Sequence, residues 1–259
     1  MSTIKLASYN VNGIRAALKK DWIEWLKQSQ VDIIGIQETK AHEDQVDLSI
    51  LKEMGFEYQY WHSAEKKGYS GVAVFSKLKP DHVVYGIDHA AFDQEGRVIR
   101  LDFGSTSLLN CYFPSGTSGD IRQQVKYEFL DYFYDYIHTL RKTRPNLIIQ
   151  GDYNIAHSEM DIHNPKGNKK SSGFLPEERA WMSKWLENGM VDTFRYFNPD
   201  TEKYTWWSYR AGARKNNKGW RIDYQAVTEG LIKKVSAATI DNDAVHSDHC
   251  PCLLEIDLD

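Results

Sequence analysis

Short apolar segments of the length of β-strands recur along the whole chain of 259 residues, and they constrain the fold more than any other feature. They are rich in β-branched and aromatic side chains and are bounded by polar or turn-forming residues, a pattern typical of buried strands. We predict eight strands, at 4–9, 32–36, 71–75, 98–103, 107–113, 147–150, 222–227 and 252–256.

Two longer segments have the periodicity of amphipathic helices. One covers 125–140, and the Arg144-Pro145 step ends it. The other begins at Pro176, where proline and two following acids suit a first helical turn, and it ends near Gly189. Its apolar stripe is expected to lie in the core and consists of Trp181, Met182, Trp185 and Leu186.

Strands and helices mixed in this way predict an α/β protein. The strands at 98–103 and 107–113 have no helix between them, so we expect them to pair antiparallel. A purely parallel sheet is therefore excluded. Because no segment has the composition of a linker, we expect residues 1–259 to form a single domain.

Several features concern the compartment of the protein. No apolar run approaches the roughly 18 residues of a membrane span, and the start of the chain, MSTIKLASYN, lacks the pattern of a signal peptide. The three cysteines are too few for a disulfide framework. A reducing cytoplasm therefore fits the chain best, with no membrane partner.

The formal net charge of −4 argues, taken alone, against a nucleic-acid partner. However, two segments contain no acidic residue: 162–176 has three lysines, and 203–222 has six basic residues. With nine positive charges there, the rest of the chain must carry −13. Trp206, Trp207 and Trp220 are interleaved with the second basic segment, and aromatic faces beside cations suit contact with phosphates and sugars.

Polar side chains follow or begin five of the predicted strands, at the positions where α/β proteins place their chemistry. They are Asn10 and Asn12, Glu38, Asp152 and Asn154, Asp223, and the pair Asp248-His249. Each alone is more commonly a cap or turn former. A faint repeat is present as well, since YNV at 9–11 and YNI at 153–155 both follow an apolar strand, as duplicated halves would produce.

If these acids converge, they repel one another by about 4 kcal/mol per pair at roughly 4 Å, for an effective dielectric constant near 20. A divalent cation removes that cost. The oxygen ligands and the absence of a Cys/His cage in the sequence favour Mg²⁺ or Mn²⁺ over zinc. Glu38 and Asp248 are our candidate ligands, with Asn10 nearby. His249 has a potential carboxylate partner in Asp223 and could act as an acid or base, or bind phosphate.

These residues resemble those of the exonuclease III class of apurinic/apyrimidinic (AP) endonucleases, within the endonuclease/exonuclease/phosphatase superfamily. The resemblance covers essentially the whole chain and is carried by SYNVNGIRA, IIGIQETK, KKGYSGVAVFSK, EGRVIRLDF, GDYNIAH, HNPKGNKKSSGF, YTWWSYRAGARKNNKGWRIDY and SDHCP. GDYNIAH, NPKGNKK and GWRIDY are the most specific to the DNA-repair branch. The implied fold is α/β, a four-layer sandwich of two packed mixed β-sheets flanked by helices, like that of DNase I.

The resemblance implies roles for individual residues. Asp152 would activate the attacking water, Asn154 would orient it, and Tyr112 would face the scissile phosphate. His249 would contact or protonate that phosphate, held by Asp223. The wider metal site would comprise Asn10, Glu38, Asp152, Asn154, Asp248 and His249. Contacts with DNA or the abasic sugar are implied for Asn12, Arg15, Lys67, Tyr69, Asn168, Lys169, Ser171, Trp206, Arg210, Trp220 and Ile222.

The chain departs from the family in its phosphate cradle and sugar pocket. Ser115 and Ser171 stand where asparagine is common, and Trp206 stands where phenylalanine is frequent. The metal centre is not affected. The expected activity is Mg²⁺-dependent (or Mn²⁺-dependent) hydrolysis of the phosphodiester 5′ to abasic sites in duplex DNA by a monomer, with 3′–5′ exodeoxyribonuclease and 3′-phosphatase or phosphodiesterase activity.

Three alternatives remain open at this point. The first is a nuclease of the same fold that is specialised for 3′-exonuclease or 3′-phosphatase work. The second is an inositol or phospholipid phosphatase, against which the aromatic and basic GWRIDY region argues. The third is a DNA-binding module without catalysis, against which the complete set of candidate catalytic residues argues.

Overall fold

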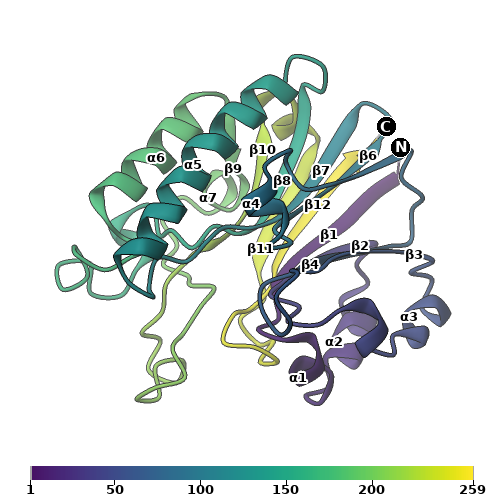
Figure 1. Cartoon of the computed structure of the whole chain (residues 1–259), viewed down its shortest axis with the longest axis horizontal. Helices are drawn as coiled ribbons and strands as arrows, with labels where there is room; N and C mark the ends of the chain where they lie inside the picture. The colour runs from purple at the N-terminus through teal and green to yellow at the C-terminus, as the bar shows by residue number, and fades with distance from the viewer. Residues whose placement is uncertain (1, 259) are drawn as a thin grey trace.

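The strands form two six-stranded sheets in a computed structural model that describes residues 2–258 (Figure 1). In order across the first sheet they are β11 (Val235–Ile240), β12 (Cys252–Leu258), β1 (Ser2–Asn10), β2 (Ile33–Gln37), β4 (Val72–Ser76) and β3 (Tyr58–His62). The second sheet has β5 (His82–Tyr85), β6 (Val98–Phe103), β7 (Thr106–Tyr112), β8 (Asn146–Asp152), β10 (Asp223–Thr228) and β9 (Met190–Asp192).

Both sheets are mixed and share one pattern. In the first, β1 is parallel to β2 and antiparallel to β12. In the second, β8 is parallel to β7 and antiparallel to β10. The two sheets face each other through a buried cluster that includes Leu6 and Ile33 from the first sheet and Leu108 and Ile148 from the second. This central layer aligns the ends of β1, β2, β7 and β8.

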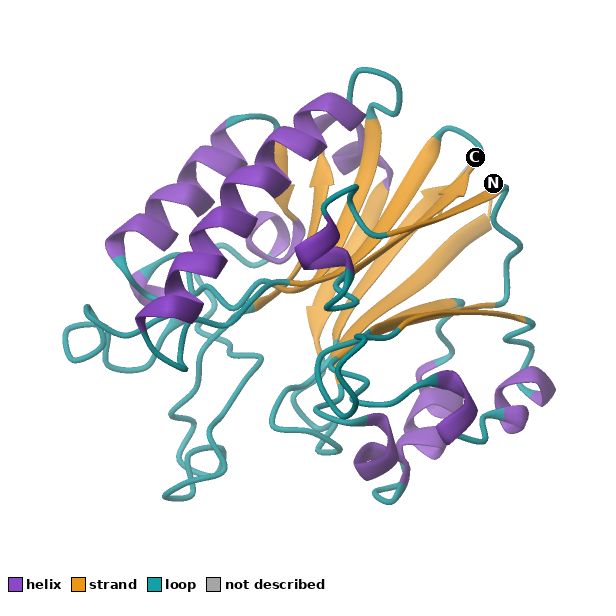
Figure 2. Cartoon of the chain, in the orientation of Figure 1, coloured by secondary structure: helices purple, strands orange, loops and turns teal. Residues whose placement is uncertain are grey.

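Helices cover the outer face of each sheet, which completes a four-layer α/β sandwich (Figure 2). Helices α5 (Asp120–Leu140) and α6 (Pro176–Glu187) bury Phe129, Phe133 and Trp185 against the second sheet, and α4 (Ala90–Asp93) packs against α5. The first sheet is covered by α1 (Ile14–Leu18), α2 (Trp22–Ser29) and α3 (Ser49–Glu53). The remaining elements are α7 (Thr193–Phe197) and the 3₁₀ helices η1 (Glu43–Gln45), η2 (Glu159–Asp161) and η3 (Glu229–Lys234).

The predicted α/β fold and its two mixed sheets are confirmed, as are all eight predicted strands. Strands β6 and β7 pair antiparallel, as expected. The first predicted helix is longer than expected, because α5 begins at Asp120 rather than Val125. Four strands were missed, namely β3, β5, β9 and β11, and these are the four edge strands of the two sheets.

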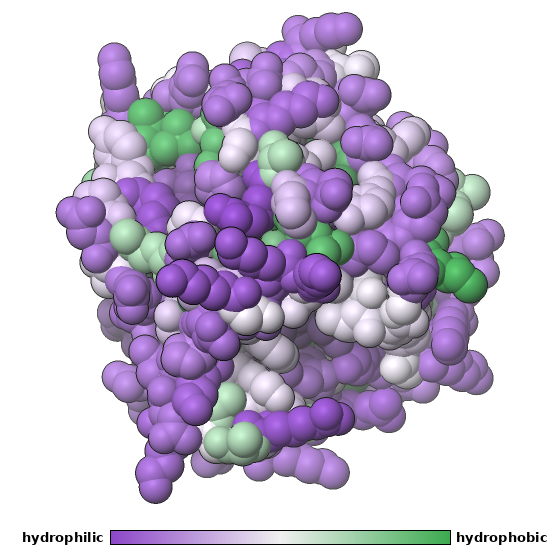
Figure 3. Space-filling model, turned by 90° about the vertical axis from the view of Figure 1, so that its left-hand side faces the viewer, coloured by the Kyte–Doolittle hydropathy of each residue, from purple (hydrophilic) through white to green (hydrophobic). Residues whose placement is uncertain are grey.

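The surface seen in Figure 3 is mostly polar, and the cysteines lie inside the protein. The face in Figure 3 is predominantly hydrophilic, with small, separated hydrophobic areas. Cys111, Cys250 and Cys252 are all buried and unpaired. Within residues 2–258, no helix combines the length and the apolar character needed to cross a membrane.

Candidate functional site

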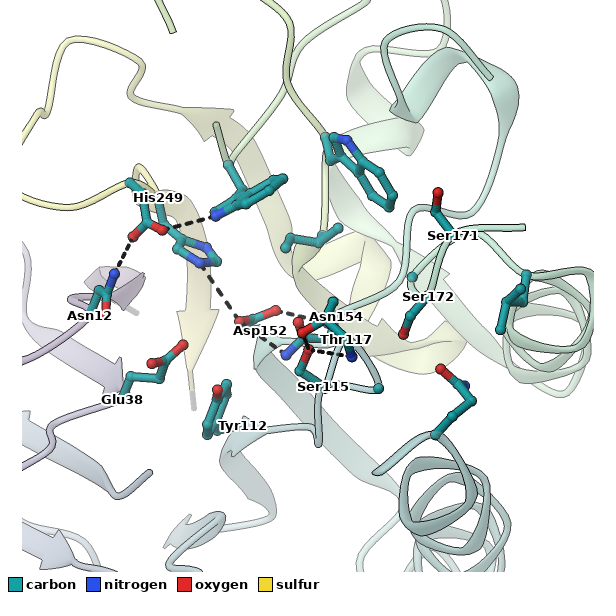
Figure 4. A pocket seen from close by; sticks show the side chains of 18 of the residues that line it. Asn12, Glu38, Tyr112, Ser115, Thr117, Asp152, Asn154, Ser171, Ser172 and His249 are labelled. Carbon is teal, nitrogen blue, oxygen red and sulfur yellow. Dashed lines mark hydrogen bonds and ion pairs between the residues drawn. The ribbon is translucent and has the colours of Figure 1, made fainter. Parts of the chain in front are cut away.

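The candidate site is a pocket of about 810 Å³ at the edge where β1, β2, β7 and β8 end and β10 begins (Figure 4). Both sheets therefore contribute to it. Twelve of the residues singled out in the sequence line the pocket: Asn12, Glu38, Tyr112, Ser115, Asp152, Asn154, Ser171, Trp206, Trp220, Ile222, Asp248 and His249. Asn10 and Asp223 lie behind this lining and are fully or almost fully buried.

Asn10 connects the two candidate carboxylates. Its Nδ2 donates to Glu38 Oε1 at 3.0 Å and to Asp152 Oδ2 at 2.9 Å. Its Oδ1 accepts a hydrogen bond from the backbone N–H of Asn12 at 2.9 Å. In this orientation Asn10 acts as a donor that holds the two acids, and its oxygen does not face the space between them.

The faint repeat of the sequence has a structural counterpart, displaced by two residues. The backbone N–H of Asn154 donates to Asp152 Oδ1 at 2.8 Å, just as that of Asn12 donates to Asn10. Both Asn12 and Asn154 have positive φ angles, of 45° and 54°. The equivalent residues are thus Asn10 with Asp152 and Asn12 with Asn154. Each pair forms the same turn at the end of an interior strand.

Glu38 also has a cationic partner that the sequence analysis missed. Lys40 Nζ lies 2.7 Å from Glu38 Oε2 and donates to Asn12 Oδ1. Burial alone would raise the pKa of Glu38, but Lys40 and the bond from Asn10 lower it below its usual value. Glu38 is therefore ionised, and a bound metal ion would have to compete with the Lys40 ammonium for it. Lys40 lies in the IIGIQETK motif, so its position two residues after Glu38 was the available signal.

His249 lies between two aspartates. Its Nδ1 is 2.9 Å from Asp223 Oδ2, and its Nε2 is 3.9 Å from Asp152 Oδ2. Burial favours the neutral ring, but the carboxylates of Asp223, Asp152 and Asp248 outweigh it and raise the pKa of His249 to about 10. The imidazole is therefore a cation at neutral pH, oriented by Asp223 and directed at Asp152.

The ionised form of Asp152 is disfavoured by its surroundings. It is paired across the sheet with Asp223, and the two strands bring their carboxylates together. Burial first, and then the charge of Asp223, raise the pKa of Asp152 to about 8, although His249 counteracts them. A divalent cation would reverse this shift, because it would offset both the lost hydration and the neighbouring negative charge.

The carboxylates of Glu38 and Asp152 could hold such a cation, whereas His249 could do so only as a neutral imidazole. Ligand atoms of Glu38, Asp152 and His249 all lie within 4.8 Å of one another. The two carboxylates are hard oxygen donors, and the unfavourable ionisation of the buried Asp152 fits a positive partner. These observations support a site for a divalent metal ion without identifying the ion.

Asp248 lines the same pocket and accepts hydrogen bonds from three side chains. Its Oδ1 accepts from Asn12 Nδ2 at 2.9 Å and from Ser247 Oγ at 3.1 Å, and its Oδ2 accepts from Trp206 Nε1 at 3.0 Å. The geometry groups Glu38 with Asp152 and His249, so a metal-ligating role for Asp248 stays a prediction.

The remaining walls are aromatic and hydroxyl-bearing. The rings of Trp206 and Trp220 meet edge to face with centroids 6.0 Å apart, and Ile222 packs beside them. Tyr112 forms another wall, with the Arg97 guanidinium 5.0 Å from the centre of its ring. Burial raises the pKa of Tyr112 well above its usual value, so its hydroxyl is neutral. Polar residues that the sequence analysis did not assign to the site also line the pocket: Thr117, Gln123, Lys170 and Ser172.

Six predicted DNA contacts lie outside the pocket. Lys67, Lys169 and Arg210 are exposed. Tyr69 accepts hydrogen bonds from Arg97 and Arg122 and donates one to Glu95. Arg15 donates to the backbone carbonyl of Lys40, and Asn168 Nδ2 donates to the backbone carbonyls of His163 and Asn164. Their contacts with DNA stay predictions.

One cation of the second basic segment, Arg221, is not available for contact with phosphates. This side chain is completely buried, with its guanidinium 2.7 Å from Asp161 Oδ1 and 2.8 Å from Asp192 Oδ2. Its charge is neutralised inside the protein. The positive field of the segment therefore comes from its other cations.

Comparison with known proteins identifies the family of this chain. Exodeoxyribonuclease of Bacillus subtilis (strain 168) is 45% identical over 257 residues, covering 98% of this chain and 100% of the relative. An AP endonuclease from Archaeoglobus fulgidus has a TM-score of 0.88 at 31% identity, and the match covers 98% of this chain and 100% of that one. The 3′ phosphatase NExo from Neisseria, solved with a product DNA hairpin, has a TM-score of 0.90 at 25% identity. This match also covers 98% of this chain and 100% of the other chain. Residues 7–249 match the endonuclease/exonuclease/phosphatase family, and the chain belongs to that family.

Proposed function

We propose that this protein is a DNA-repair nuclease, which hydrolyses the phosphodiester 5′ to abasic sites and also removes nucleotides and phosphates from 3′ ends. The observation that carries the proposal is the convergence of Glu38, Asp152 and the Asp223-held His249 in one pocket, beside an apolar wall. The names of relatives support the class, since they include an exodeoxyribonuclease and an AP endonuclease.

In the proposed mechanism, Glu38 and Asp152 would hold Mg²⁺ or Mn²⁺, which would supply positive charge beside the phosphate. Asp152 accepts a proton from the attacking water, and Asn154, whose Nδ2 is 3.3 Å from Asp152 Oδ2, helps to orient it. His249 is held by Asp223 and donates a hydrogen bond to the phosphate. Phosphorus–oxygen cleavage leaves a 3′-hydroxyl and a 5′-deoxyribose phosphate.

The aromatic wall supports a preference for a sugar without a base. Trp206, Trp220 and Ile222 present apolar surface on one side of the pocket, where an abasic sugar could pack. Such a nucleotide flips out of the duplex at little cost in stacking energy, because it has no base to unstack.

The test is cleavage of a duplex that carries a single reduced abasic analogue, in Mg²⁺ and in EDTA. We expect incision 5′ to the analogue in Mg²⁺ and none in EDTA. Metal-independent binding without a product in any divalent ion would instead indicate a binding module and refute the proposal.

The relative weight of the activities is a separate question. The Neisseria neighbour is a 3′ phosphatase, and Ser115 and Ser171, which stand where asparagine is common, both line the pocket. A 3′-recessed duplex and a 3′-phosphate duplex, assayed beside the abasic duplex, separate a 3′-specialised enzyme from an AP endonuclease by rate. We propose the AP endonuclease as the main activity because the apolar wall lines the same pocket as the reacting groups.

We also propose that the chain acts as a monomer on duplex DNA and that residues 1–259 are one domain. The core cluster shared by the two sheets supports the single domain. A cytoplasmic location is consistent with the three free, buried thiols.

A further inference from the structure

Arg214 has no role in the proposed mechanism, yet its side chain donates hydrogen bonds to a loop that forms part of the site. Its Nη1 donates to the backbone carbonyl of Ser247 at 2.9 Å, and its Nη2 donates to those of Asn242 at 3.0 Å and Ala244 at 2.5 Å. The guanidinium also lies over the ring of Trp207, 4.6 Å from its centroid. Although Arg214 belongs to the second basic segment, its donors point at protein carbonyls.

The three carbonyls belong to one segment, 241–249, which makes up most of the loop between β11 and β12 and ends in Asp248 and His249. Arg214 belongs to another loop, 203–222. Figure 1 shows both loops projecting from the same end of the sandwich. Arg214 therefore spans from the loop with the exposed cations to the loop that carries two candidate site residues.

Further hydrogen bonds connect residues 204–207, near the start of the 203–222 loop, to the loop between β11 and β12. The backbone N–H of Trp207 donates to the carbonyl of Asp248 at 2.9 Å, and that of Cys250 donates to the carbonyl of Thr205 at 2.7 Å. Asn242 Nδ2 donates to the carbonyl of Tyr204 at 2.9 Å. These bonds hold the ends of the 241–249 segment, and Arg214 adds bonds along it, to Asn242, Ala244 and Ser247.

We propose that Arg214 is a positioning residue, which sets the placement of Asp248 and His249 from the neighbouring DNA-facing loop. This inference rests on the proposed nuclease function. Arginine suits the task because its planar guanidinium directs five N–H donors at fixed angles, so that it can bind several carbonyls at once. Lysine carries the same charge but cannot reproduce that geometry.

The consequence concerns turnover rather than affinity. Displacement of a catalytic group by about 1 Å can cost on the order of a hundredfold in rate. With Arg214 removed, three carbonyls lose their donors and the 241–249 loop can shift, together with His249. Phosphate contacts made by the exposed Lys215 and Lys218 would be unaffected.

The experiment compares Arg214→Ala and Arg214→Lys with Arg144→Ala in cleavage of the abasic duplex. Arg144 is a matched control, because it also donates to backbone carbonyls, those of Gly104 and Thr106, at the opposite end of the second sheet. We expect kcat to fall about 10- to 100-fold in both Arg214 variants, with little change in KM or in salt dependence. Guanidinium ion added at millimolar concentration should partly restore the kcat of Arg214→Ala, and methylammonium should not.

A second readout does not depend on activity. Hydrogen exchange of the amides in 242–249 should become faster in Arg214→Ala and remain unchanged in Arg144→Ala. Unchanged exchange in that loop overturns the inference even if the protein proves not to be a nuclease. So does a raised KM with a flatter salt dependence at unchanged kcat, which would make Arg214 a phosphate ligand. Failure of the wild-type protein to cleave the duplex counts against the proposed function alone.

Discussion

Asn10 Nδ2 donates a 2.9 Å hydrogen bond to Asp152 Oδ2, although the two residues end interior strands of different sheets. The same nitrogen donates to Glu38, so one buried amide holds an acid from each sheet. The relative positions of Glu38 and Asp152 therefore depend on how the sheets pack. The geometry of the site is thus tied to the buried layer between the two sheets.

Replacement of Asp152 by asparagine tests its assignment as the base. The amide of the Asp152→Asn variant would keep the shape of the side chain but could not accept a proton, so we expect kcat on the abasic duplex to fall about 10²- to 10⁴-fold in Mg²⁺. Near-normal turnover would show that the assignment is wrong.

The same variant should not lose stability. Burial and Asp223 raise the pKa of Asp152, which means that its ionised form is disfavoured in the folded protein. Asparagine removes that charge, so the melting temperature of the metal-free protein should stay the same or rise. A clear drop would mean that the loss of activity reflects unfolding.

Lys40→Met tests competition at Glu38. Without the ammonium 2.7 Å from the carboxylate, a metal ion no longer has to displace a resident cation. We expect the Mg²⁺ concentration for half-maximal binding, measured by calorimetry, to fall a few-fold. Lys142→Met, at an exposed site outside the pocket, is the matched control. A higher requirement for Mg²⁺ in Lys40→Met would show that Lys40 assists the metal instead.

Salt dependence tests the basic segment 162–176. Lys169 is exposed near the pocket residues Lys170 and Ser171, so we expect it to contact a phosphate. Lys169→Gln should then reduce the slope of log K against log salt by about 1, as measured by titration of a fluorescent duplex. Lys27→Gln, on α2, should leave the slope unchanged. Equal slopes for wild type and Lys169→Gln would exclude Lys169 from the DNA contact surface.

The stability of the protein at acid pH tests the buried ion pairs that Asp161 forms with Arg195 and Arg221. Burial would raise the pKa of Asp161, but Arg221 and Arg195 outweigh it and lower that pKa below its unfolded value of about 3.9. The ionised Asp161 therefore stabilises the fold above about pH 4, and this stabilisation is lost as the pH falls towards the folded pKa.

We accordingly expect Asp161→Asn to lower the free energy of unfolding by about 3–5 kcal/mol at pH 7, because Arg221 loses a buried partner. The difference from wild type should shrink below about pH 4 in urea titrations. Asp131→Asn, at an exposed position of α5, should show neither effect. A pH-independent difference would mean that Asp161 acts by packing alone.

The interior of each sheet could be predicted from sequence, and the edges could not. Interior strands such as β4 are buried along their whole length, so their residues are continuously apolar. Edge strands such as β3 and β5 are half-buried or exposed and lack such a run. Their conformation depends on a hydrogen-bonded neighbour, and that neighbour is a property of the tertiary structure.

The candidate site divides in a similar way. The polar residues after strands could be read from the chain, and the resemblance supplied their roles. The sequence could not show that Arg221 is neutralised by Asp161 and Asp192 while nearby cations stay exposed. A run of basic residues looks the same in either case, because partners distant in the chain decide which side chains are buried.

The sequence by itself determined the α/β class, the interior strands and the types of chemical group at their ends, because local periodicity and residue type encode them. Only the tertiary structure decided that Asn10 holds Glu38 and Asp152 together, that Lys40 neutralises Glu38 and that Arg214 braces the loop of His249. These contacts follow from the packing of two sheets and the approach of separate loops. Their distances are therefore set by the assembled core rather than by spacing along the chain.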